Sequence, residues 1–343
     1  MTCALLMQNL YSNMINSNLK LNPDLFDQSK LESKPTRDGF GHGLVDAAKA
    51  NSNIVGLTAD LSESTRMEWF QKEFPDRFIE IGVAEQNLVT VASGMANVGK
   101  IPFITSYATF SPGRNWEQIR TTVCINDMPV KVIGCHAGLT VGPDGATHQA
   151  LEDIAIMRAL PNMTVIVPAD IHQAHAATRA IAESGKPAYL RLGRSGVPTF
   201  TTVETPFQIG KAQVIYETES ADVTIIACGS LVYEALQAVK VLEGEGINAN
   251  VINLHTIKPI DRNAIIAAAK KTGAIVTAEE HQIMGGMGSA VAEVVVEEFP
   301  VPMEFVGVRD SFGQSGTPEE LLKFYKVDRD AIVVAVQDVV RRK

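Results

Sequence analysis

The sequence from Arg37 onward alternates short β-branched or apolar runs with longer segments of helical period. Parallel strands joined by helical crossovers produce this rhythm, and the helices then cover both faces of the sheet. The predicted fold class is therefore α/β. In the first half, strands are expected near residues 53–60, 78–83, 101–107, 129–135, 164–170 and 187–192, with helices near 38–51, 84–99, 115–127, 151–160 and 170–185.

The rhythm breaks once, at residues 198–210, where two Pro and several Thr interrupt it before a second α/β series begins. We therefore expect two domains, 36–203 and 204–343, each a largely parallel sheet flanked by helices. A chain of 343 residues is long enough for each domain to bury its own core. Residues 1–35 are rich in Asn, Ser and Lys, which predicts a poorly ordered N-terminal extension outside the fold.

Composition excludes several classes of partner. The net charge of −9 is spread without acidic blocks, which argues against nucleic acid and favours a small-molecule or protein partner. No basic residue precedes Lys20, so neither a signal peptide nor a membrane span is expected. The four cysteines form no CxxC pair or metal-ligand spacing, which is typical of buried thiols in a reducing compartment, and the expected location is the cytoplasm.

Glycine motifs for nucleotides are missing from the sequence. There is no GxxxxGK[ST], and no GxGxxG lies between an expected strand and helix, so nucleoside triphosphate and dinucleotide hypotheses lose their main support. The glycine-rich run "MGGMGSA" at 284–290 precedes an expected helix. We interpret it as a loop with close backbone packing in preference to an anion site.

The residues suited to chemistry concentrate between 85 and 194. In the segment 132–153, "VIGCHAGLTVGPDGATHQALED", His136, Asp144 and His148 lie among glycines at the end of an expected strand. Each has an ordinary alternative, since a lone His is usually hydrogen-bonded structure and Pro-Asp-Gly is a strong turn signal. Together they form a polar loop with donors and acceptors but no metal geometry, and sugar hydroxyls are the natural ligands.

Four segments in a fixed order resemble a known family: "IGVAEQN", "TSYATFSPGRNWEQIR", "CHAGLTVGPDGATHQALEDIAIMRALPNM" and "YLRLGR". The resemblance is to the pyrimidine-binding domain of transketolases followed by their C-terminal domain, over about residues 36–343. The first half of a full-length transketolase, which holds the diphosphate and metal of the cofactor, has no counterpart here. The resemblance therefore implies the C-terminal subunit of a split transketolase.

For that subunit the resemblance implies two-carbon ketol transfer between a ketose phosphate and an aldose phosphate. The implied cofactor is thiamine diphosphate, with Mg²⁺ or Ca²⁺ held by a separate N-terminal subunit and no metal ligand expected in this chain. The implied partners are that subunit, sugar phosphates and a second copy of this chain, within an α2β2 assembly.

The cofactor residues that the resemblance implies begin with Glu85. Its carboxyl would hydrogen-bond the pyrimidine nitrogen of thiamine diphosphate, inside a dry pocket of the neighbouring apolar residues Ile81, Val83 and Leu88. Phe110 and Trp116 match aromatic positions around the aminopyrimidine, and Asp60 matches a residue near the cofactor at the subunit interface. Gly113 replaces an aromatic residue of the full-length enzymes, which alters the expected stacking surface.

The substrate residues also follow from the resemblance. His136 and His148 match catalytic histidines that bind the hydroxyl end and the reacting oxygen of the donor, and Asp144 matches the residue that reads the hydroxyl next to the carbonyl. Three positions match a clamp for the sugar phosphate, where guanidinium groups suit a dianion: Arg37, Ser64 and Arg194. A surface arginine is the ordinary alternative for Arg37.

Three other functions remain open. A 1-deoxyxylulose-5-phosphate synthase shares the Glu and the "DGxTHQ" string but lacks the counterpart of His136. The β subunit of a 2-oxo-acid dehydrogenase has the same two domains without the sugar loop. A non-catalytic scaffold subunit is the third. In the second domain, Glu279, Glu280 and His281 form a polar cluster to which we assign no catalytic role, and the domain is expected to be structural.

Overall fold

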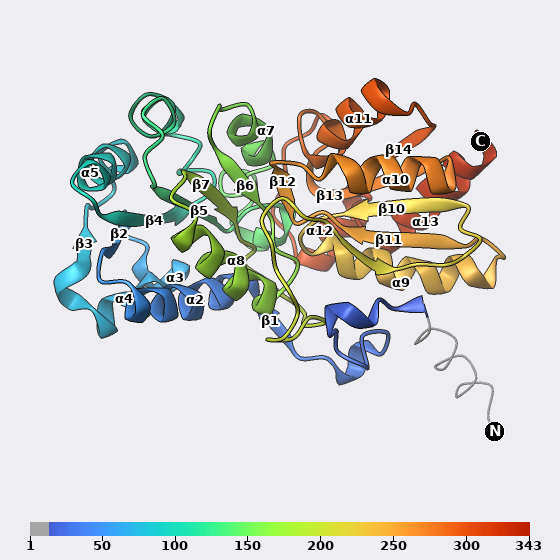
Figure 1. Ribbon diagram of the computed structural model, residues 1–343, viewed down its shortest axis with the longest axis horizontal. Helices are drawn as coiled ribbons and strands as arrows, with labels where there is room; N and C mark the ends of the chain where they lie inside the picture. Colours follow the sequence, from blue (N-terminus) through green and yellow to red (C-terminus); the bar gives the residue numbers. More distant parts are fainter. Residues whose placement is uncertain (1–13) are drawn as a thin grey trace.

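The computed structural model describes residues 14–343, which form two α/β domains lying side by side (Figure 1). The first domain contains a seven-stranded sheet of order β12-β6-β7-β5-β4-β2-β3. All neighbouring pairs are parallel except β12 with β6. The strands are β2 Ile54–Thr58, β3 Phe78–Glu80, β4 Ile101–Tyr107, β5 Lys131–Cys135, β6 Thr164–Ile166, β7 Ala188–Arg191 and, from the second half of the chain, β12 Thr256–Lys258.

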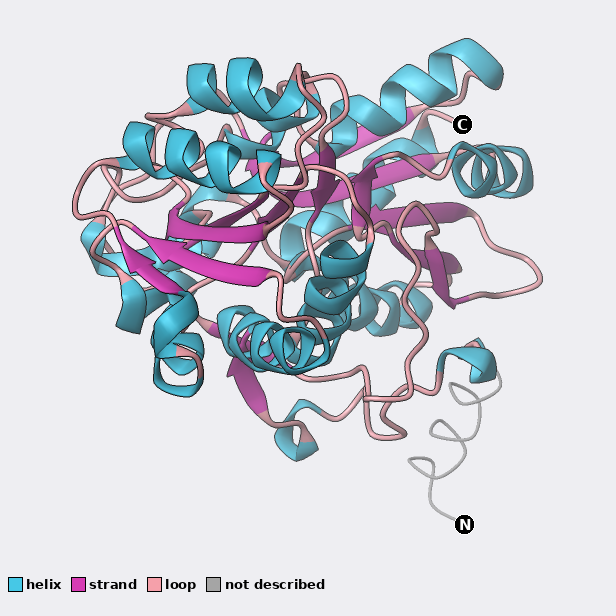
Figure 2. Ribbon diagram, turned by 60° about the vertical axis from the view of Figure 1, so that its left-hand side comes forward, coloured by secondary structure: helices cyan, strands magenta, loops and turns pink. Residues whose placement is uncertain are grey.

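Helices cover both faces of this sheet, as the alternation of the sequence predicts (Figure 2). One face packs against α2 (Thr36–Ala50), α4 (Met67–Glu73) and α8 (Ile171–Glu183), and the other against α5 (Glu85–Asn97) and α7 (Asp153–Arg158). The α2–α8 contact is close because α2 carries glycines: a Cβ on Gly39 would lie 2.0 Å from the backbone oxygen of Ile171. The short elements between are α3 Ser62–Thr65, η3 Pro75–Arg77, α6 Trp116–Gln118, η4 Ile119–Cys124 and η5 Leu139–Asp144.

The second domain has a five-stranded sheet of order β14-β13-β10-β11-β9, parallel except for β9. Its strands are β9 Gln213–Tyr216, β10 Val223–Ala227, β11 Ala249–Asn253, β13 Ile275–Gln282 and β14 Met303–Val308. Its helices are α9 Leu231–Gly244, α10 Arg262–Thr272, α11 Met287–Glu298, α12 Pro318–Tyr325 and α13 Arg329–Arg341. The two sheets with flanking helices confirm the predicted fold class.

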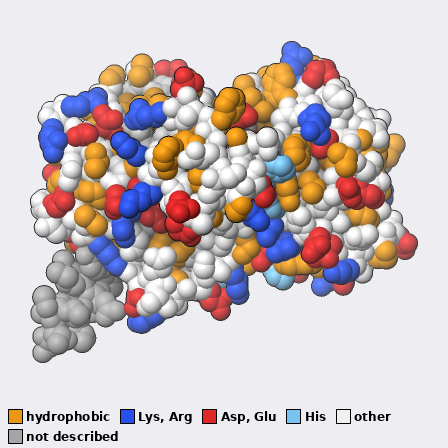
Figure 3. All heavy atoms as spheres, turned by 180° about the vertical axis from the view of Figure 1, so that it is seen from behind, with side chains coloured by type: hydrophobic (Ala, Val, Ile, Leu, Met, Phe, Trp, Pro, Cys, Tyr) orange, Lys and Arg blue, Asp and Glu red, His pale blue; other side chains and the backbone are white. Residues whose placement is uncertain are grey.

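One of the apolar clusters spans both domains. Buried residues of α5, such as Leu88, belong to the same cluster as Ile226 of β10 and Met287 of α11. Burial of continuous apolar surface across a boundary holds two domains in a fixed relation. The polar surface is mixed, because acidic and basic side chains are interspersed over the face seen from behind (Figure 3).

The structure corrects the expectation for the segment before the first domain. Residues 14–35 form η1 (Ser17–Leu19), η2 (Gln28–Lys30) and β1 (Ser33–Pro35), and β1 pairs antiparallel with β8 (Gly196–Pro198). Leu19 and Leu25 are buried in the core of the second domain. These apolar side chains give the segment enough burial to pack, so the expected poorly ordered extension does not describe residues 14–35; residues 1–13 lie outside the described part of the chain.

Candidate functional site

The candidate site lies at the carboxyl ends of the central strands of the first sheet, where ligands bind in open α/β sheets. Glu85 is the first residue of α5 and is only 2 % exposed. Its Oε2 accepts a hydrogen bond from Arg114 Nη1 at 2.6 Å. Asn115 donates to the backbone oxygen of Glu85 at 2.9 Å and to Ser111 Oγ at 3.0 Å. Arg114 therefore holds the carboxylate, and Asn115 holds the backbone of the same residue.

The surroundings of Glu85 differ from the expected dry pocket. Leu88 is buried and Ile81 is half-buried, but the side chain of Val83 is 72 % exposed. The immediate partner of the carboxylate is the guanidinium of Arg114, whose own side chain is half exposed. Glu85 is thus buried beneath a charged residue that reaches solvent, and apolar neighbours enclose it on only part of its surface.

Aromatic and imidazole rings form a wall beside Glu85. Tyr107 ends β4 and stacks on His136, which directly follows β5, with ring centroids 3.9 Å apart. Phe110 lies 6.1 Å from Tyr107 and 5.4 Å from His148 between ring centroids. The guanidinium of Arg114 lies over the Phe110 ring at 4.9 Å, so the wall and the Glu85 carboxylate share one residue. Glu85, Phe110, His136 and His148 therefore lie around one site, and the roles that the resemblance implies for them stay predictions.

Arg37 joins this wall to Ser64. Its Nη1 donates to the backbone oxygen of Ser64 at 2.8 Å and lies 3.2 Å from His136 Nε2. Because an arginine can only donate, Nε2 must accept, and the imidazole proton therefore resides on Nδ1. Burial, followed by the charges of Arg37 and Arg194, lowers the pKa of His136 to about 3. His136 is consequently a neutral ring whose Nδ1–H donor has a defined position.

Two buried donors in this region have no hydrogen-bond partner among the described residues, His136 Nδ1 and Arg37 Nε. Leaving a buried donor unpaired costs about 1–3 kcal/mol, so native structures pair such groups unless a ligand does so. The two atoms belong to residues in direct contact with one another. Beside the ring wall, they are two N–H donors from which oxygen atoms of a ligand could accept hydrogen bonds.

Asp144 and Arg194 form the outer rim. Arg194 Nη1 lies 3.9 Å from an Asp144 carboxylate oxygen and donates to the backbone oxygen of Val141. Asp144 ends η5 and is exposed. The rim therefore presents one acidic and one basic group to solvent, next to the buried His136.

Asp60 and Trp116 lie apart from this arrangement. The exposed Asp60 has a positive φ of 57° and donates its backbone N–H to Glu80 Oε1 at 2.8 Å. The Trp116 indole packs on the apolar core and donates to the backbone oxygen of Ile156 at 2.9 Å. The structure thus gives Trp116 a packing contact, and cofactor roles for both residues stay predictions. Sequence reasoning missed Tyr107 and Arg114, although both lie in the segment "TSYATFSPGR".

The donor set fits part of thiamine diphosphate. A fixed carboxylate, a half-buried phenylalanine ring and unpaired N–H donors suit an aminopyrimidine and a polyhydroxylated substrate. Within residues 14–343, no group of three or more His, Cys, Asp or Glu side chains could hold a metal ion. The described residues therefore fit the pyrimidine end of the cofactor and offer no set of ligands for its metal.

Over the same residues, every helix is too short or too polar to cross a bilayer.

Comparisons with known proteins agree with this combination of fold and site. The family described as transketolase, pyrimidine binding domain matches residues 32–199, and transketolase, C-terminal domain matches residues 210–332. The chain belongs to the transketolase family, and it has the two domains that make up the C-terminal subunit of a split transketolase.

Two relatives and one solved structure match this chain over nearly their whole length. A protein described as a transketolase C-terminal section from Methanocaldococcus jannaschii is 43 % identical over 90 % of this chain and 98 % of its own length. A 6-deoxy-6-sulfo-D-fructose transketolase subunit from a Clostridium species is 41 % identical over 92 % and 97 %. A solved split-gene transketolase, described as an inactive β4 tetramer, superposes with a TM-score of 0.84 at 48 % identity and covers 90 % of this chain and 98 % of its own.

Proposed function

We propose that this chain catalyses two-carbon ketol transfer from a ketose phosphate to an aldose phosphate, as the C-terminal subunit of a thiamine-diphosphate-dependent transketolase. The observation that carries the proposal is the contact of Glu85, through Arg114, with a wall of Phe110 and two histidines. A buried carboxylate fixed beside an aromatic face is what an aminopyrimidine requires.

Thiamine diphosphate, when bound, supplies the stabilisation of the two-carbon carbanion. Glu85 would hold the pyrimidine nitrogen and exchange a proton with it, and Phe110 would pack against the ring face. The half-buried position of Phe110 leaves part of its ring accessible. Asp60, exposed at the end of β2, would face the N-terminal subunit, which would contribute the diphosphate site and Mg²⁺ or Ca²⁺.

The donor sugar would lie between the ring wall and the rim. The His136 Nδ1–H would donate to a sugar oxygen, and His148, at the edge of the Phe110 ring, would act on the reacting oxygen. Asp144 would read the hydroxyl next to the carbonyl. Arg37 and Arg194 would bind the anionic group of the sugar, which we propose is a phosphate. The backbone oxygen of Ser64 holds Arg37 in position. Because one relative is described as acting on a sulfonated sugar, sulfonates belong in the same assays.

The active assembly would contain two copies of this chain and two N-terminal subunits. Support comes from the relatives, which match this chain over nearly their whole length and include a split-gene protein whose β4 tetramer is described as inactive. The buried, free thiols of Cys124, Cys135 and Cys228 suit a reducing compartment, and we place the assembly in the cytoplasm.

Calorimetric titration with thiamine diphosphate and Mg²⁺ tests the proposal. The chain should bind no cofactor alone, and binding should appear when an N-terminal-type transketolase subunit is added, together with ketol transfer between sugar phosphates. Tight binding by this chain alone would overturn the division of the cofactor between subunits. Cofactor binding by the mixture without any transfer from phosphorylated or sulfonated ketoses would overturn the proposed reaction.

A further inference from the structure

The loop that carries Asp144 is attached to the second domain by a buried carboxylate. Glu280, near the end of β13, is 6 % exposed. Its Oε1 accepts a hydrogen bond from the backbone N–H of Thr140 at 2.6 Å, and its Oε2 accepts one from Ser230 Oγ at 3.2 Å. Thr140 lies within η5, between His136 and Asp144. One side chain of the second domain therefore contacts the loop 136–149 of the first domain, which is called the substrate loop below because it carries the proposed donor-binding residues.

Gln149 makes a second attachment of the same loop. Its Nε2 donates to the backbone oxygens of Leu139 and Gly142, both within η5, at 3.2 Å each. The same nitrogen lies 3.0 Å from the backbone oxygen of Gln314 in the second domain. The loop is thus held at several backbone positions, with protein partners on both sides of the domain boundary.

Close packing leaves the loop little room to move. Gly138, with φ of 88°, faces Glu280, and a Cβ there would lie 2.4 Å from Glu280 Oε1. Gly145, with φ of 75°, faces Ser315, and a Cβ there would lie 2.7 Å from its Oγ. Side chains at these positions would displace the loop from the second domain.

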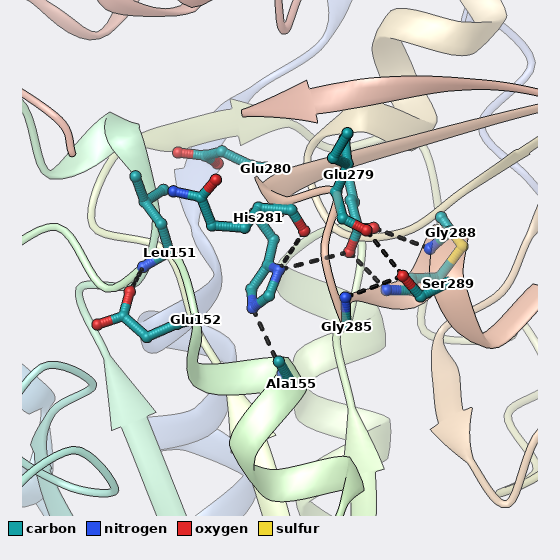
Figure 4. Close-up of polar contacts among 12 residues, drawn as sticks. Leu151, Glu152, Ala155, Glu279, Glu280, His281, Gly285, Gly288 and Ser289 are labelled. Atoms are coloured by element: carbon teal, nitrogen blue, oxygen red, sulfur yellow. Dashed lines mark hydrogen bonds and ion pairs between the residues drawn. The ribbon is translucent and has the colours of Figure 1, made fainter. Parts of the chain in front are cut away.

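The backbone of Glu280 is itself fixed. Arg191 donates to the backbone oxygen of Glu280 at 2.9 Å, and its Nε donates to Asp153 Oδ2 at 2.8 Å. Glu280 points away from Glu279, its neighbour on β13 (Figure 4). Successive strand residues face opposite sides, so Glu279 contacts α11 while Glu280 contacts the loop.

The position of Glu280 is one where an α/β sheet ordinarily binds a ligand. In the order β14-β13-β10-β11, the chain leaves β10 toward β11 on one side and returns as β13 on the other, which creates a crevice at their carboxyl ends. Ser230 and Glu280 occupy this crevice with Thr140 against them. The space left beside these residues is a cavity of about 30 Å³, which suits a single water molecule.

We propose that the second domain uses this crevice to position the substrate loop, and that Glu280 is a positioning residue for the donor sugar. The proposal rests on the proposed ketol transfer, because the loop carries Asp144 between His136 and His148. It replaces the expectation of a domain with only a general structural role. Glu280 acts through Thr140 and touches neither substrate nor cofactor.

Hydrogen–deuterium exchange of the isolated chain tests the attachment without any turnover. In Glu280→Ala, exchange of residues 136–149 should accelerate at least about tenfold, because the Thr140 N–H loses its acceptor. Glu280→Gln keeps an acceptor and should remain near wild type. Glu279→Ala is the matched control, since it removes an equally buried carboxylate from the same strand and should leave the exchange of 136–149 unchanged. Ser230→Ala should shift exchange in the same direction as Glu280→Ala but less.

Kinetics of the complex with the N-terminal subunit then separate positioning from stability. Glu280→Ala should raise the KM for the donor about tenfold with little change in kcat, whereas Glu279→Ala should leave that KM unchanged. Unchanged exchange in both Glu280→Ala and Ser230→Ala would overturn the proposal, as would equal acceleration in Glu279→Ala. If Glu280→Ala does not fold, Ser230→Ala decides. A wild-type complex without ketol transfer would overturn the proposed function, while the exchange result would still decide the attachment.

Discussion

The two sheets present similar residues at their carboxyl edges and use them differently. At the first edge, His136 and Arg37 keep buried donors without partners, and Asp144 and Arg194 are open to solvent. At the second edge, Glu279 and Glu280 accept hydrogen bonds from this chain's own backbone. The difference teaches that carboxylates and imidazoles at a strand end do not by themselves define a site. What separates the two edges, within residues 14–343, is whether protein groups already occupy those side chains, as they do for Glu279 and Glu280 and do not for His136 Nδ1 and Arg37 Nε.

The second edge is closed from within by Glu279. Its carboxylate accepts from the backbone N–H groups of Met287 and Gly288, at the start of α11, at 2.6 and 2.8 Å. A Cβ on Gly286 would lie 2.3 Å from Glu279 Oε2, so glycine is required there. The glycine-rich run at 284–290 is thus a closely packed loop, as expected, and the acceptor for the N–H groups at this helix start is a carboxyl group of the protein itself.

The carboxyl edge of the first sheet, which carries Glu85, His136, Asp144 and Arg194, is called the open edge below. Replacement of Glu85 should have the largest effect there. Glu85→Gln keeps the size of the side chain and an acceptor for Arg114, so folding and assembly should be retained. Gln cannot exchange a proton with the cofactor, and kcat of the complex should fall by about a hundredfold to ten-thousandfold. The measurement is steady-state ketol transfer, with Glu117→Gln on the exposed surface of α6 as control. Near-normal turnover would remove Glu85 from the chemistry and break the contrast between the edges.

Much of this contrast could be predicted from the sequence, and the reasons for the failures are physical. Alternating periodicity predicts the sheets because it reports local burial, and the family motifs place Glu85, His136 and His148 together. Val83 was expected to enclose Glu85 because it is apolar, yet it is exposed, and a pattern of neighbours along the chain does not reveal which side chain faces solvent. The contact of Thr140 with Glu280 joins residues 140 positions apart, and no local signal encodes such a pairing.

Replacement of Asp144 should have an intermediate effect, confined to substrate choice. Asp144→Ala removes a charged acceptor from the rim while the buried His136 and Arg37 remain. Discrimination between donors that differ at the hydroxyl next to the carbonyl should weaken by about 1–3 kcal/mol, with cofactor binding unchanged. Ratios of kcat/KM for two such ketoses measure it, and Asp76→Ala, exposed in η3 before β3, is the control. An unchanged ratio would exclude Asp144 from the open edge.

The carboxyl edge of the second sheet, which carries Glu279, Glu280 and His281, is called the closed edge below. Its stability should depend on pH because the pKa values of two buried side chains are shifted in opposite directions. Burial lowers the pKa of His281 from 6.5 to about 4, and burial raises the pKa of Glu279 from 4.5 to about 7, against the effect of its two N–H donors. As pH falls from 6.5 toward 4, the unfolded chain protonates His281 before the folded chain does, so stability is lost. As pH falls from 7 toward 4.5, the folded chain protonates Glu279 first, so stability is gained.

The two residues therefore offset each other in wild type, and removing one should expose the other. Relative to wild type, Glu279→Gln should lose about 1.4 kcal/mol more unfolding free energy per pH unit of acidification, and His281→Gln about 1.4 kcal/mol less, within the window where each residue's folded and unfolded protonation differ. Urea unfolding at a series of pH values measures both slopes, and each variant's slope is compared with wild type so that all other titrating groups cancel. Profiles parallel to wild type would mean that these side chains hold the same protons folded and unfolded. The second edge would then be open to water, and the contrast with the first would fail.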